Sequence, residues 1–475
     1  MADALSLAKS LKNREVTSVS LVEQAYQAIA ETDGDIKAYL TLTKESAMAQ
    51  AQSIDKRLDQ GEELPLLAGI PIGIKDNILL KGFKTTCASK MLENFVAPYD
   101  ATVIEKINAQ GLIPVGKLNM DEFAMGSSTQ FSAFQVTRNP RNLDYVPGGS
   151  SGGSAATVSA NQVPLSLGSD TGGSIRQPAS FCGIVGLKPT YGRVSRYGLV
   201  SFASSLDQIG PMATTVGGAA ALLNVISGFD SKDSTSEQVE VPDFTQAIGQ
   251  SVSGKRIGVP KVLMGDAVDP QIRKAIDATL ADLVAKGATW EVVDFGCMDE
   301  ALSVYYILAP AEASSNLERY DGVRYGHRKP DAANLNDMYT RTRGEGFGPE
   351  VKRRIILGTY VLSSGYYDAY YLKAQKVRSL VIKAYQKAFE SVDVILSPTV
   401  PSLPFKLGEN LEDPIAMYLQ DIATIPANLA GLPAISVPCG TSSEGLPIGV
   451  QITGKAFDEM TVLSVADAIH VKETL

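Results

Sequence analysis

The chain is poor in the residues that most metal-dependent and redox sites use. Its 475 residues include two histidines and four cysteines. The cysteines, Cys87, Cys182, Cys297 and Cys439, are far apart in the sequence and form no Cys-x-x-Cys pair. A zinc knuckle or a redox dithiol therefore has no local support, and we expect four reduced thiols and no bound metal.

The two histidines have surroundings that are typical of surface residues. His327 lies in the charged run RYGHRKPD, and His470 lies five residues from the C-terminus. These surroundings argue against a catalytic triad that uses a histidine. The stretch 149–153 matches the G-x-S-x-G elbow with Ser151 at its centre, but a glycine-rich loop produces this match easily and no strand precedes it.

Long apolar runs, internal repeats and an excess of positive charge are also missing. No stretch of 18 apolar residues appears, and the first residues, MADALSLAKSLKNREV, carry charges where a secretion signal needs a continuous apolar region. The net charge of −9 argues against general binding to nucleic-acid backbones, although residues 352–354 form a local basic cluster. We expect a cytoplasmic protein without membrane association.

The composition indicates one large globular domain. Apolar residues make up 44% of the chain and charged residues 20%, and the only long polar run, 227–243, is interpreted as a surface loop. We expect residues 1–475 to form a single domain, with a helical N-terminal segment over about residues 1–60 packed on it. In that segment Ser20 and Glu23 have the spacing of a capping box.

Short apolar strands alternate with amphipathic helices along the chain. The clearest unit is a strand at 256–260, a helix that begins at Asp269-Pro270, and a strand at 289–295. Further strand candidates lie at 112–116, 163–170, 393–398, 434–438 and 447–454. Several are apolar on both faces, which is typical of strands covered by helices on both sides. The sequence predicts an α/β fold, a three-layer α/β/α sandwich around a large mixed sheet.

The segment GLIPVGK, residues 111–117, has the spacing of a phosphate-binding loop. Leu118 stands where such a loop needs a magnesium-binding hydroxyl group, and Pro114 lies among apolar residues. We therefore interpret this segment as a strand.

Two loops rich in serine and glycine are the most informative feature. GGSSGGSAA, residues 148–156, and SDTGGSIRQPAS, residues 169–180, place several small hydroxyl groups on open backbone. In the second loop, the run 171–174 can turn consecutive N–H groups towards one point, as a developing oxyanion requires. The alternative is a plain tight turn before a helix.

Lys75 is the long polar side chain at the end of the mostly apolar segment GIPIGIKDN. A lysine acts as a base only when its amine is neutral, so burial must lower its pKa from about 10.4 to about 7, which costs roughly 4 kcal/mol. The apolar neighbours favour this change. The adjacent Asp76 opposes it if its carboxylate points the same way.

These three motifs together resemble those of the amidase signature enzymes, and the resemblance covers nearly the whole chain. It implies that Ser174 is the nucleophile, that Ser150 is the bridging serine after a cis peptide bond with Gly149, and that Lys75 is the general base. Ser151 then becomes a loop residue. The implied oxyanion hole is lined by Thr171, Gly172 and Gly173.

Within the family, residues 117–156 and the segment DIATIPANLAGLPAISVPCG resemble the glutaminase subunits of tRNA-dependent amidotransferases. Glutamine is a zwitterion, so its site needs an acid for the ammonium group and a cation for the carboxylate. The resemblance implies Asp421 and Arg354 for these roles, and Tyr305, Met125 and Ser128 for the rest of the pocket.

The same resemblance implies a heterotrimer with subunits B and C. This chain would hydrolyse glutamine to glutamate and ammonia without a cofactor of its own, and the partner would use ATP and magnesium to convert Glu-tRNA(Gln) to Gln-tRNA(Gln). Charged tRNA would be contacted mainly by the partner. The alternatives are a stand-alone amidase of the same family that acts on a small or acyl amide, and a non-catalytic scaffold.

Overall fold

The computed structural model describes residues 2–296, 298–409 and 414–469. At its centre lies an 11-stranded sheet with the order β1-β3-β2-β4-β6-β5-β10-β11-β9-β7-β8. The strands are β1 (Tyr39–Leu42), β2 (Pro71–Lys75), β3 (Ile113–Leu118), β4 (Leu165–Asp170), β5 (Val185–Lys188), β6 (Gln208–Ala213), β7 (Arg256–Pro260), β8 (Thr289–Val293), β9 (Val394–Pro398), β10 (Ala434–Thr441) and β11 (Pro447–Gly454).

The sheet is mixed, as the sequence predicts. β2 pairs in parallel with β3 and β4, and β7 pairs in parallel with β8 and β9. Between these two groups β4, β6, β5, β10, β11 and β9 pair antiparallel. β2 and β4 are parallel neighbours, so their C-terminal ends lie at one edge of the sheet, where Lys75 is close to Ser169.

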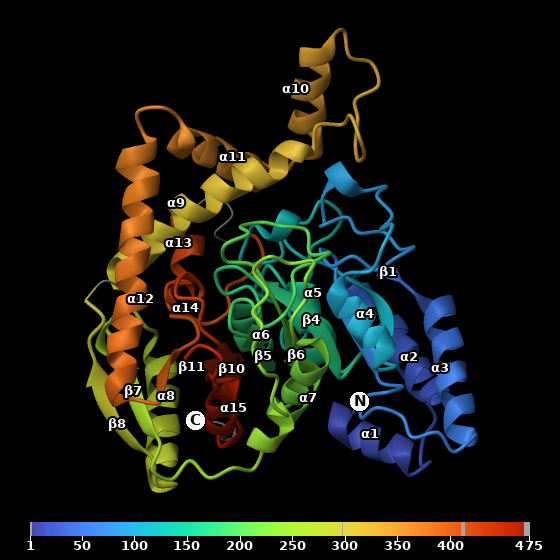
Figure 1. The fold of residues 1–475 in the computed structure, drawn as a ribbon, viewed down its shortest axis with the longest axis vertical. Helices are drawn as coiled ribbons and strands as arrows, with labels where there is room; N and C mark the ends of the chain where they lie inside the picture. Colours follow the sequence, from blue (N-terminus) through green and yellow to red (C-terminus); the bar gives the residue numbers. More distant parts are fainter. Residues whose placement is uncertain (1, 297, 410–413, 470–475) are drawn as a thin grey trace.

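Helices cover both faces of the sheet (Figure 1). One apolar core lies between the sheet and α1 (Ala4–Lys12), α4 (Thr102–Ala109), α7 (Val216–Ile226), α8 (Pro270–Ala285) and α15 (Glu459–Asp467). A second lies between the sheet and α2 (Ser18–Ile36), α3 (Lys44–Asp59), α5 (Gly152–Ser159) and α6 (Arg176–Cys182). The predicted three-layer sandwich is confirmed.

A helical lobe carries a third apolar cluster beside the sheet. It contains α9 (Met298–Asn316), α11 (Pro349–Leu362), α12 (Lys373–Ser391) and α14 (Ile425–Leu429), while α10 (Leu335–Gly346) projects from the top of the molecule in Figure 1. The remaining helical segments are α13 (Pro414–Leu419), the π-helical η6 (Tyr367–Leu372), and the short turns η1 (Lys90–Leu92), η2 (Glu122–Ala124), η3 (Phe244–Ala247), η4 (Lys261–Met264) and η5 (Leu317–Arg319).

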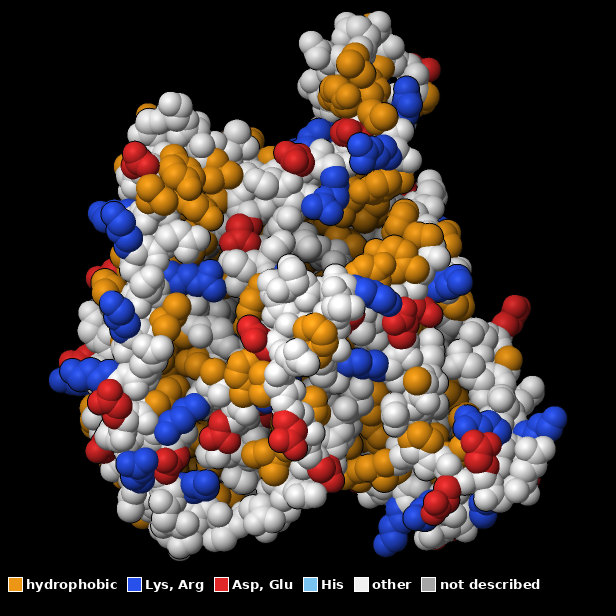
Figure 2. All heavy atoms as spheres, in the orientation of Figure 1, with side chains coloured by type: hydrophobic (Ala, Val, Ile, Leu, Met, Phe, Trp, Pro, Cys, Tyr) orange, Lys and Arg blue, Asp and Glu red, His pale blue; other side chains and the backbone are white. Residues whose placement is uncertain are grey.

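Figure 2 shows hydrophobic side chains gathered near the top of α12, beside the end of α11. Tyr360, Tyr366, Tyr367 and Tyr370 are all exposed in this region. The rings of Tyr360 and Tyr366 pack with their centroids 4.3 Å apart. The lobe therefore presents a cluster of aromatic rings to solvent.

Most local predictions agree with the structure. The unit β7, α8, β8 is the predicted strand, helix and strand, residues 111–117 lie mostly in β3, and 227–243 contain no helix or strand. The predicted capping box is wrong: Thr17 caps α2, and its side chain accepts from Ser20 N–H while the Ser20 hydroxyl occupies the reciprocal position. No helix in the described ranges is long and apolar enough to cross a membrane.

Candidate active site

Lys75 ends β2 with its amine enclosed by serine oxygens. Its side chain is fully buried, and Nζ donates to Ser150 Oγ at 2.8 Å, Ser151 Oγ at 2.8 Å and Ser169 Oγ at 2.9 Å. The Ser169 carbonyl oxygen lies at 3.3 Å. No carboxylate of the described residues forms an ion pair with Lys75, so its neighbours are neutral oxygens.

This environment suits a neutral amine. Burial lowers the pKa of Lys75 to about 7, although Asp121, Asp170, Asp207 and Cys87 act in the opposite direction. Burial thus favours the neutral form of the Lys75 amine, the form that can accept a proton.

The adjacent Asp76 points away from Lys75. Asp76 lies in the turn that follows β2, and its carboxylate contacts groups other than the Lys75 amine. Asp76 Oδ1 forms an ion pair with Lys117 Nζ at 3.1 Å, and Asp76 Oδ2 accepts from the Thr86 N–H at 2.8 Å. The Asp76 carboxylate is therefore not directed at the Lys75 amine, because it is paired with Lys117.

Ser150 and Ser151 lie in the loop before α5. The Gly149–Ser150 peptide bond is cis, at the position that the resemblance implies. Both side chains are fully buried, and the Ser150 carbonyl accepts from the Asp121 N–H at 3.2 Å. The loop thus turns two neighbouring hydroxyl groups towards one amine.

Ser174 lies in the loop between β4 and α6. Its carbonyl accepts from the Ser151 N–H at 3.2 Å, so the two serine loops contact each other directly. The Ser174 hydroxyl group forms no hydrogen bond with any residue that the structure describes, and the side chain is 8% exposed. The structure therefore joins Lys75 to Ser150, whereas the Ser150 to Ser174 step of the relay stays a prediction.

The predicted oxyanion loop offers several unused donors. Within the described part of the chain we find no acceptor for the N–H groups of Thr171, Gly172 and Ser174. The Gly173 N–H, in contrast, donates to Asp170 Oδ1 at 2.8 Å. The role of Gly173 in an oxyanion hole stays a prediction, and its donor is already used within the protein.

A buried ion pair holds this loop. Burial raises the pKa of Asp170, but Arg176 outweighs that effect and the pKa falls to about 2. Arg176 Nε donates to Asp170 Oδ2 at 3.0 Å, and Arg176 Nη1 donates to the Thr424 carbonyl at 3.0 Å. The pair fixes the loop and ties it to the segment that follows Asp421.

Tyr305, from α9, lies directly against the oxyanion loop. A Cβ atom at Gly172 would lie 2.8 Å from the Tyr305 hydroxyl oxygen, so only glycine fits there. The Thr424 hydroxyl donates to the Gly172 carbonyl at 2.6 Å. The structure therefore brings the predicted pocket residue Tyr305 to the glycine loop, together with Thr424, which was not predicted.

Arg354, on α11, is a buried cation that keeps free donors. Its Nε donates to Glu350 Oε1 at 2.8 Å, and its guanidinium carbon lies 5.4 to 5.5 Å from the ring centroids of Phe202, Tyr306 and Tyr418. Neither terminal nitrogen donates to any described residue. Such a fork fits a carboxylate ligand.

Asp421 is a buried carboxylate with one side-chain hydrogen-bond partner among the described residues. Ser127 Oγ donates to Asp421 Oδ2 at 2.6 Å, and the Asp421 side chain is 6% exposed. Burial raises the pKa of Asp421 to about 7, and the Ser127 hydrogen bond and the Arg354 charge offset part of this effect. Sequence reasoning named Ser128 and missed Ser127.

Met125 and Ser128 lie in the buried segment that faces the Ser150 loop. A Cβ atom at Gly149 would lie 2.6 Å from the Ser128 nitrogen. The Ser128 N–H donates to Asp121 Oδ2 at 3.2 Å, and the Met125 side chain is fully buried. Ser128 therefore packs beside the catalytic loop through its backbone.

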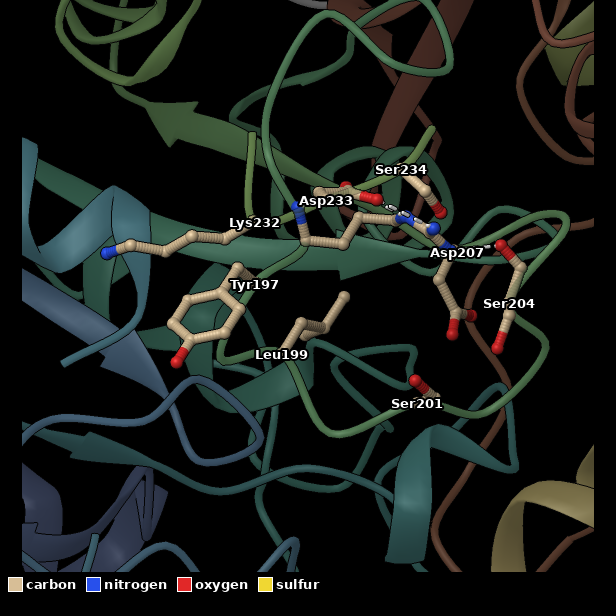
Figure 3. Close-up of a pocket in the computed structure, with 9 residues that line it drawn as sticks. Tyr197, Leu199, Ser201, Ser204, Asp207, Lys232, Asp233 and Ser234 are labelled. Atoms are coloured by element: carbon tan, nitrogen blue, oxygen red, sulfur yellow. Dashed lines mark hydrogen bonds and ion pairs between the residues drawn. The ribbon is translucent and has the colours of Figure 1, made fainter. Parts of the chain in front are cut away.

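A pocket of about 180 Å³ is lined in part by Asp207 (Figure 3). Figure 3 shows Asp207 near Ser201 and Ser204, with Lys232 and Tyr197 at the other end. Asp207 Oδ1 accepts from the Thr171 hydroxyl at 2.7 Å, which links the pocket to the loop. None of the predicted site residues lines it.

Two further residues at the amine were missed by sequence reasoning. Ser169 Oγ accepts from Lys75 and also from Asn77 Nδ2 at 2.9 Å, and Asn77 is 2% exposed. Both residues lie within the motifs that were recognised. Their types and positions were visible, but their contact depends on the pairing of β2 with β4.

A buried lysine amine lies among serine hydroxyl groups, beside a glycine loop whose N–H groups have no acceptor among the described residues. This arrangement is typical of an amide-cleaving serine hydrolase. The model of the family described as Amidase matches residues 20–463, and the chain belongs to this family.

Three relatives show how far the similarity extends. The A subunit of glutamyl-tRNA(Gln) amidotransferase from Geobacillus thermodenitrificans is 59% identical over 460 residues, which cover 97% of this chain and 95% of that protein. The crystal structure of the corresponding A subunit from Thermotoga maritima has a TM-score of 0.80 at 45% identity, and covers 95% of this chain and 91% of that one. The peptide amidase from Stenotrophomonas maltophilia has a TM-score of 0.82 at 28% identity, and covers 98% and 96%.

Proposed function

We propose that this chain is the glutaminase subunit of a tRNA-dependent amidotransferase. It hydrolyses glutamine to glutamate and ammonia, and a partner subunit uses the ammonia to convert Glu-tRNA(Gln) to Gln-tRNA(Gln). The observation that carries the chemistry is the buried Lys75 amine, 2.8 Å from Ser150 Oγ and without an ion-pair partner among the described residues. The similarity to the amidotransferase A subunits supports the substrate.

The reaction begins with a proton relay. Neutral Lys75 accepts the Ser150 proton while Ser150 accepts the proton of Ser174. Ser174 Oγ then attacks the side-chain amide carbon of glutamine, and the carbonyl oxygen becomes an oxyanion. The unused N–H groups of the glycine loop stabilise that oxyanion by hydrogen bonds.

The relay runs backwards to release ammonia. The proton on Lys75 returns through Ser150 to the amide nitrogen, the carbon–nitrogen bond breaks, and a γ-glutamyl ester remains on Ser174. Water attacks this ester and gives one proton to the relay, which returns it to Ser174 Oγ as the ester bond breaks. The products are glutamate and the unchanged enzyme.

Recognition of glutamine uses the two buried charges beside the glycine loop. The free terminal nitrogens of Arg354 bind the α-carboxylate, and Asp421 binds the α-ammonium group. Tyr305 packs against the oxyanion loop at Gly172, where an added Cβ atom would lie 2.8 Å from its hydroxyl oxygen. An uncharged amide has neither charged group and gains nothing from this pair.

The chain works with partner subunits B and C, in a heterotrimer, and needs no cofactor of its own for the hydrolysis described above. ATP and magnesium belong to the partner reaction, and charged tRNA is contacted mainly by the partner. Ammonia must pass to that partner without release, because free ammonia is mostly protonated at neutral pH and then lacks a nucleophilic lone pair.

The decisive experiment combines activity with covalent trapping. The purified chain, alone and then with B and C subunits, charged tRNA and ATP, is assayed for glutamate and ammonia release from glutamine. A diazoketone analogue of glutamine should label Ser174, and Ser174→Ala should abolish both labelling and release. Ser154→Ala is the matched control, because the Ser154 hydroxyl is buried nearby but bonds to the Leu167 carbonyl.

The outcomes separate the candidate functions. Rapid hydrolysis of simple amides without partners, together with indifference to glutamine, would identify a stand-alone amidase. Failure of the analogue to label Ser174 in the complete assembly would exclude the serine mechanism.

A further inference from the structure

The Lys75 amine has more oxygen neighbours than a neutral amine has hydrogens. A neutral amine carries two N–H donors and one lone pair, whereas the protonated form carries three donors and no lone pair. Four oxygen atoms from three residues lie within 3.3 Å of Nζ. Catalysis requires that the lone pair, and not an N–H, faces Ser150. The hydrogen bonds of these neighbours therefore determine which oxygens accept from the two N–H groups.

Ser151 acts as an acceptor towards Lys75. The Ser151 hydroxyl donates its hydrogen to the Ser169 carbonyl at 3.1 Å, and its oxygen also accepts from the Ser169 N–H at 3.3 Å. A hydroxyl group has one hydrogen. That hydrogen is used, so the contact between Ser151 Oγ and Nζ at 2.8 Å must be made by an N–H of Lys75.

Ser169 accepts the second hydrogen. Two of its oxygens face Nζ, Oγ at 2.9 Å and the backbone carbonyl at 3.3 Å, and a carbonyl oxygen only accepts. Asn77 Nδ2 donates to the same Oγ at 2.9 Å and holds it in place from the segment that follows β2. An N–H directed at Ser169 is therefore satisfied. One direction remains, and Ser150 occupies it.

We infer that Ser151 and Ser169 are positioning residues, which take up both N–H groups of the neutral Lys75 amine and so direct its lone pair at the Ser150 hydroxyl. This inference rests on the proposed function, because it assigns an orientation to the base of that reaction. Neither residue exchanges a proton with substrate. Asn77 supports the arrangement by fixing Ser169.

Other titratable groups act on Lys75 only through space. Three carboxylates and one thiol influence its charge, from the residues Asp121, Asp170, Asp207 and Cys87. None of them hydrogen-bonds to Nζ in the described chain. A change at Ser151 or Ser169 leaves all four in place, so a shifted pH profile reports on the hydroxyl contacts.

The test compares Ser169→Ala and Ser151→Ala with the unchanged enzyme in the full assembly. Each variant should lower kcat on the high-pH plateau by about tenfold to a hundredfold, a part of the usual effect of a positioned base. Removal of an acceptor also destabilises the charged amine, so the acid limb of kcat/KM should move to lower pH. A lower plateau with activity extended to lower pH is a result that simple loss of folded protein does not produce.

Two controls keep the test decisive. Ser166→Ala removes another buried hydroxyl from β4, one that bonds to the Ser154 carbonyl, and it should leave both the plateau and the acid limb unchanged. Ser169→Thr keeps the hydroxyl group and should restore most of the rate. An unchanged plateau in both alanine variants, or an equal loss in Ser166→Ala, would overturn the inference.

The proposed function and this inference fail in different ways. If the unchanged enzyme acts on a simple amide and ignores glutamine, the proposed glutaminase function fails, and the same variants measured on that amide still decide the role of the two serines. If glutamine is hydrolysed and the variants match the unchanged enzyme, only the inference fails.

Discussion

Two buried lysines, Lys75 on β2 and Lys117 on the neighbouring β3, have opposite kinds of partner. On one face Lys75 meets only hydroxyl and carbonyl oxygens. On the other, Lys117 from β3 forms an ion pair with Asp76 at 3.1 Å and donates to Thr85 Oγ1 at 3.1 Å. Both lysine side chains are fully buried. The same residue type is the proposed base on one face and compensates a charge on the other.

This difference shows that burial alone does not make a base. A carboxylate within a few ångströms favours the charged form of an amine, whereas burial without one favours the neutral form. The turn after β2 directs Asp76 to Lys117, which neutralises the carboxylate that would otherwise act on the Lys75 amine. The two lysines are therefore parts of one electrostatic arrangement.

The sharpest contrast is expected when each lysine is replaced by a methionine of similar shape. Lys75→Met should lower kcat by about 10³-fold or more, because the relay loses its base, while the protein stays folded. Turnover of glutamine and circular dichroism measure the two effects. Retention of a tenth of the activity would contradict the assigned role.

Lys117→Met should act mainly on stability. It leaves the Asp76 carboxylate buried without its cation, and breaking such a pair by removing one partner costs about 3 to 5 kcal/mol. Urea unfolding measures the loss. Adding Asp76→Asn to the variant should recover part of it, and a single variant as stable as the unchanged protein would show that the pair carries little energy.

The recognition charges should affect binding more than chemistry. Arg354→Ala and Asp421→Asn should each raise the KM for glutamine by about ten- to a hundredfold, the worth of a hydrogen bond to a charged group, with little effect on a simple uncharged amide. Arg353→Ala is the matched control, because this neighbour also pairs with Glu350 but is 41% exposed. Equal losses on both substrates would mean that the two residues hold the fold.

The pH dependence should separate the base from the recognition acid. Lys75 must lose its proton to act, so kcat/KM for an uncharged amide should rise about tenfold per pH unit below pH 7 and level above it. Asp421, whose pKa is also raised to about 7, must be ionised to bind ammonium. The glutamine profile should therefore be steeper than the amide profile on the acid side. Parallel profiles would remove Asp421 from ammonium binding.

The sequence alone was most informative where one motif carries the whole feature. The apolar runs predict β3, β4 and β7 to β11, whereas β1, β2, β5 and β6 were not named as strands, and GIPIGIKDN showed only that Lys75 follows mostly apolar residues. The capping box was misplaced because Thr17 and Ser20 are equally able to cap a helix, and only the backbone decides between them.

Contacts across strands lay beyond sequence reasoning. The pairing of Asp76 with Lys117 depends on the register of β2 against β3, and the contact of Asn77 with Ser169 depends on the neighbourhood of β2 and β4. Arg354 and Asp421 were named from resemblance alone, since an isolated arginine or aspartate has no distinguishing pattern. The burial of both residues and the unused donors of Arg354 are properties of the folded chain.

The Thr424 hydroxyl group gives the molecule a mechanical property. It bridges the turn after Asp421 to the Gly172 carbonyl, so the residue proposed to bind the ammonium group of glutamine is linked to the loop proposed to bind the reacting oxygen. A ligand that shifts one must shift the other. Ligand affinity and the rate of cleavage should therefore both depend on Thr424, and substitutions of this residue should alter both at once.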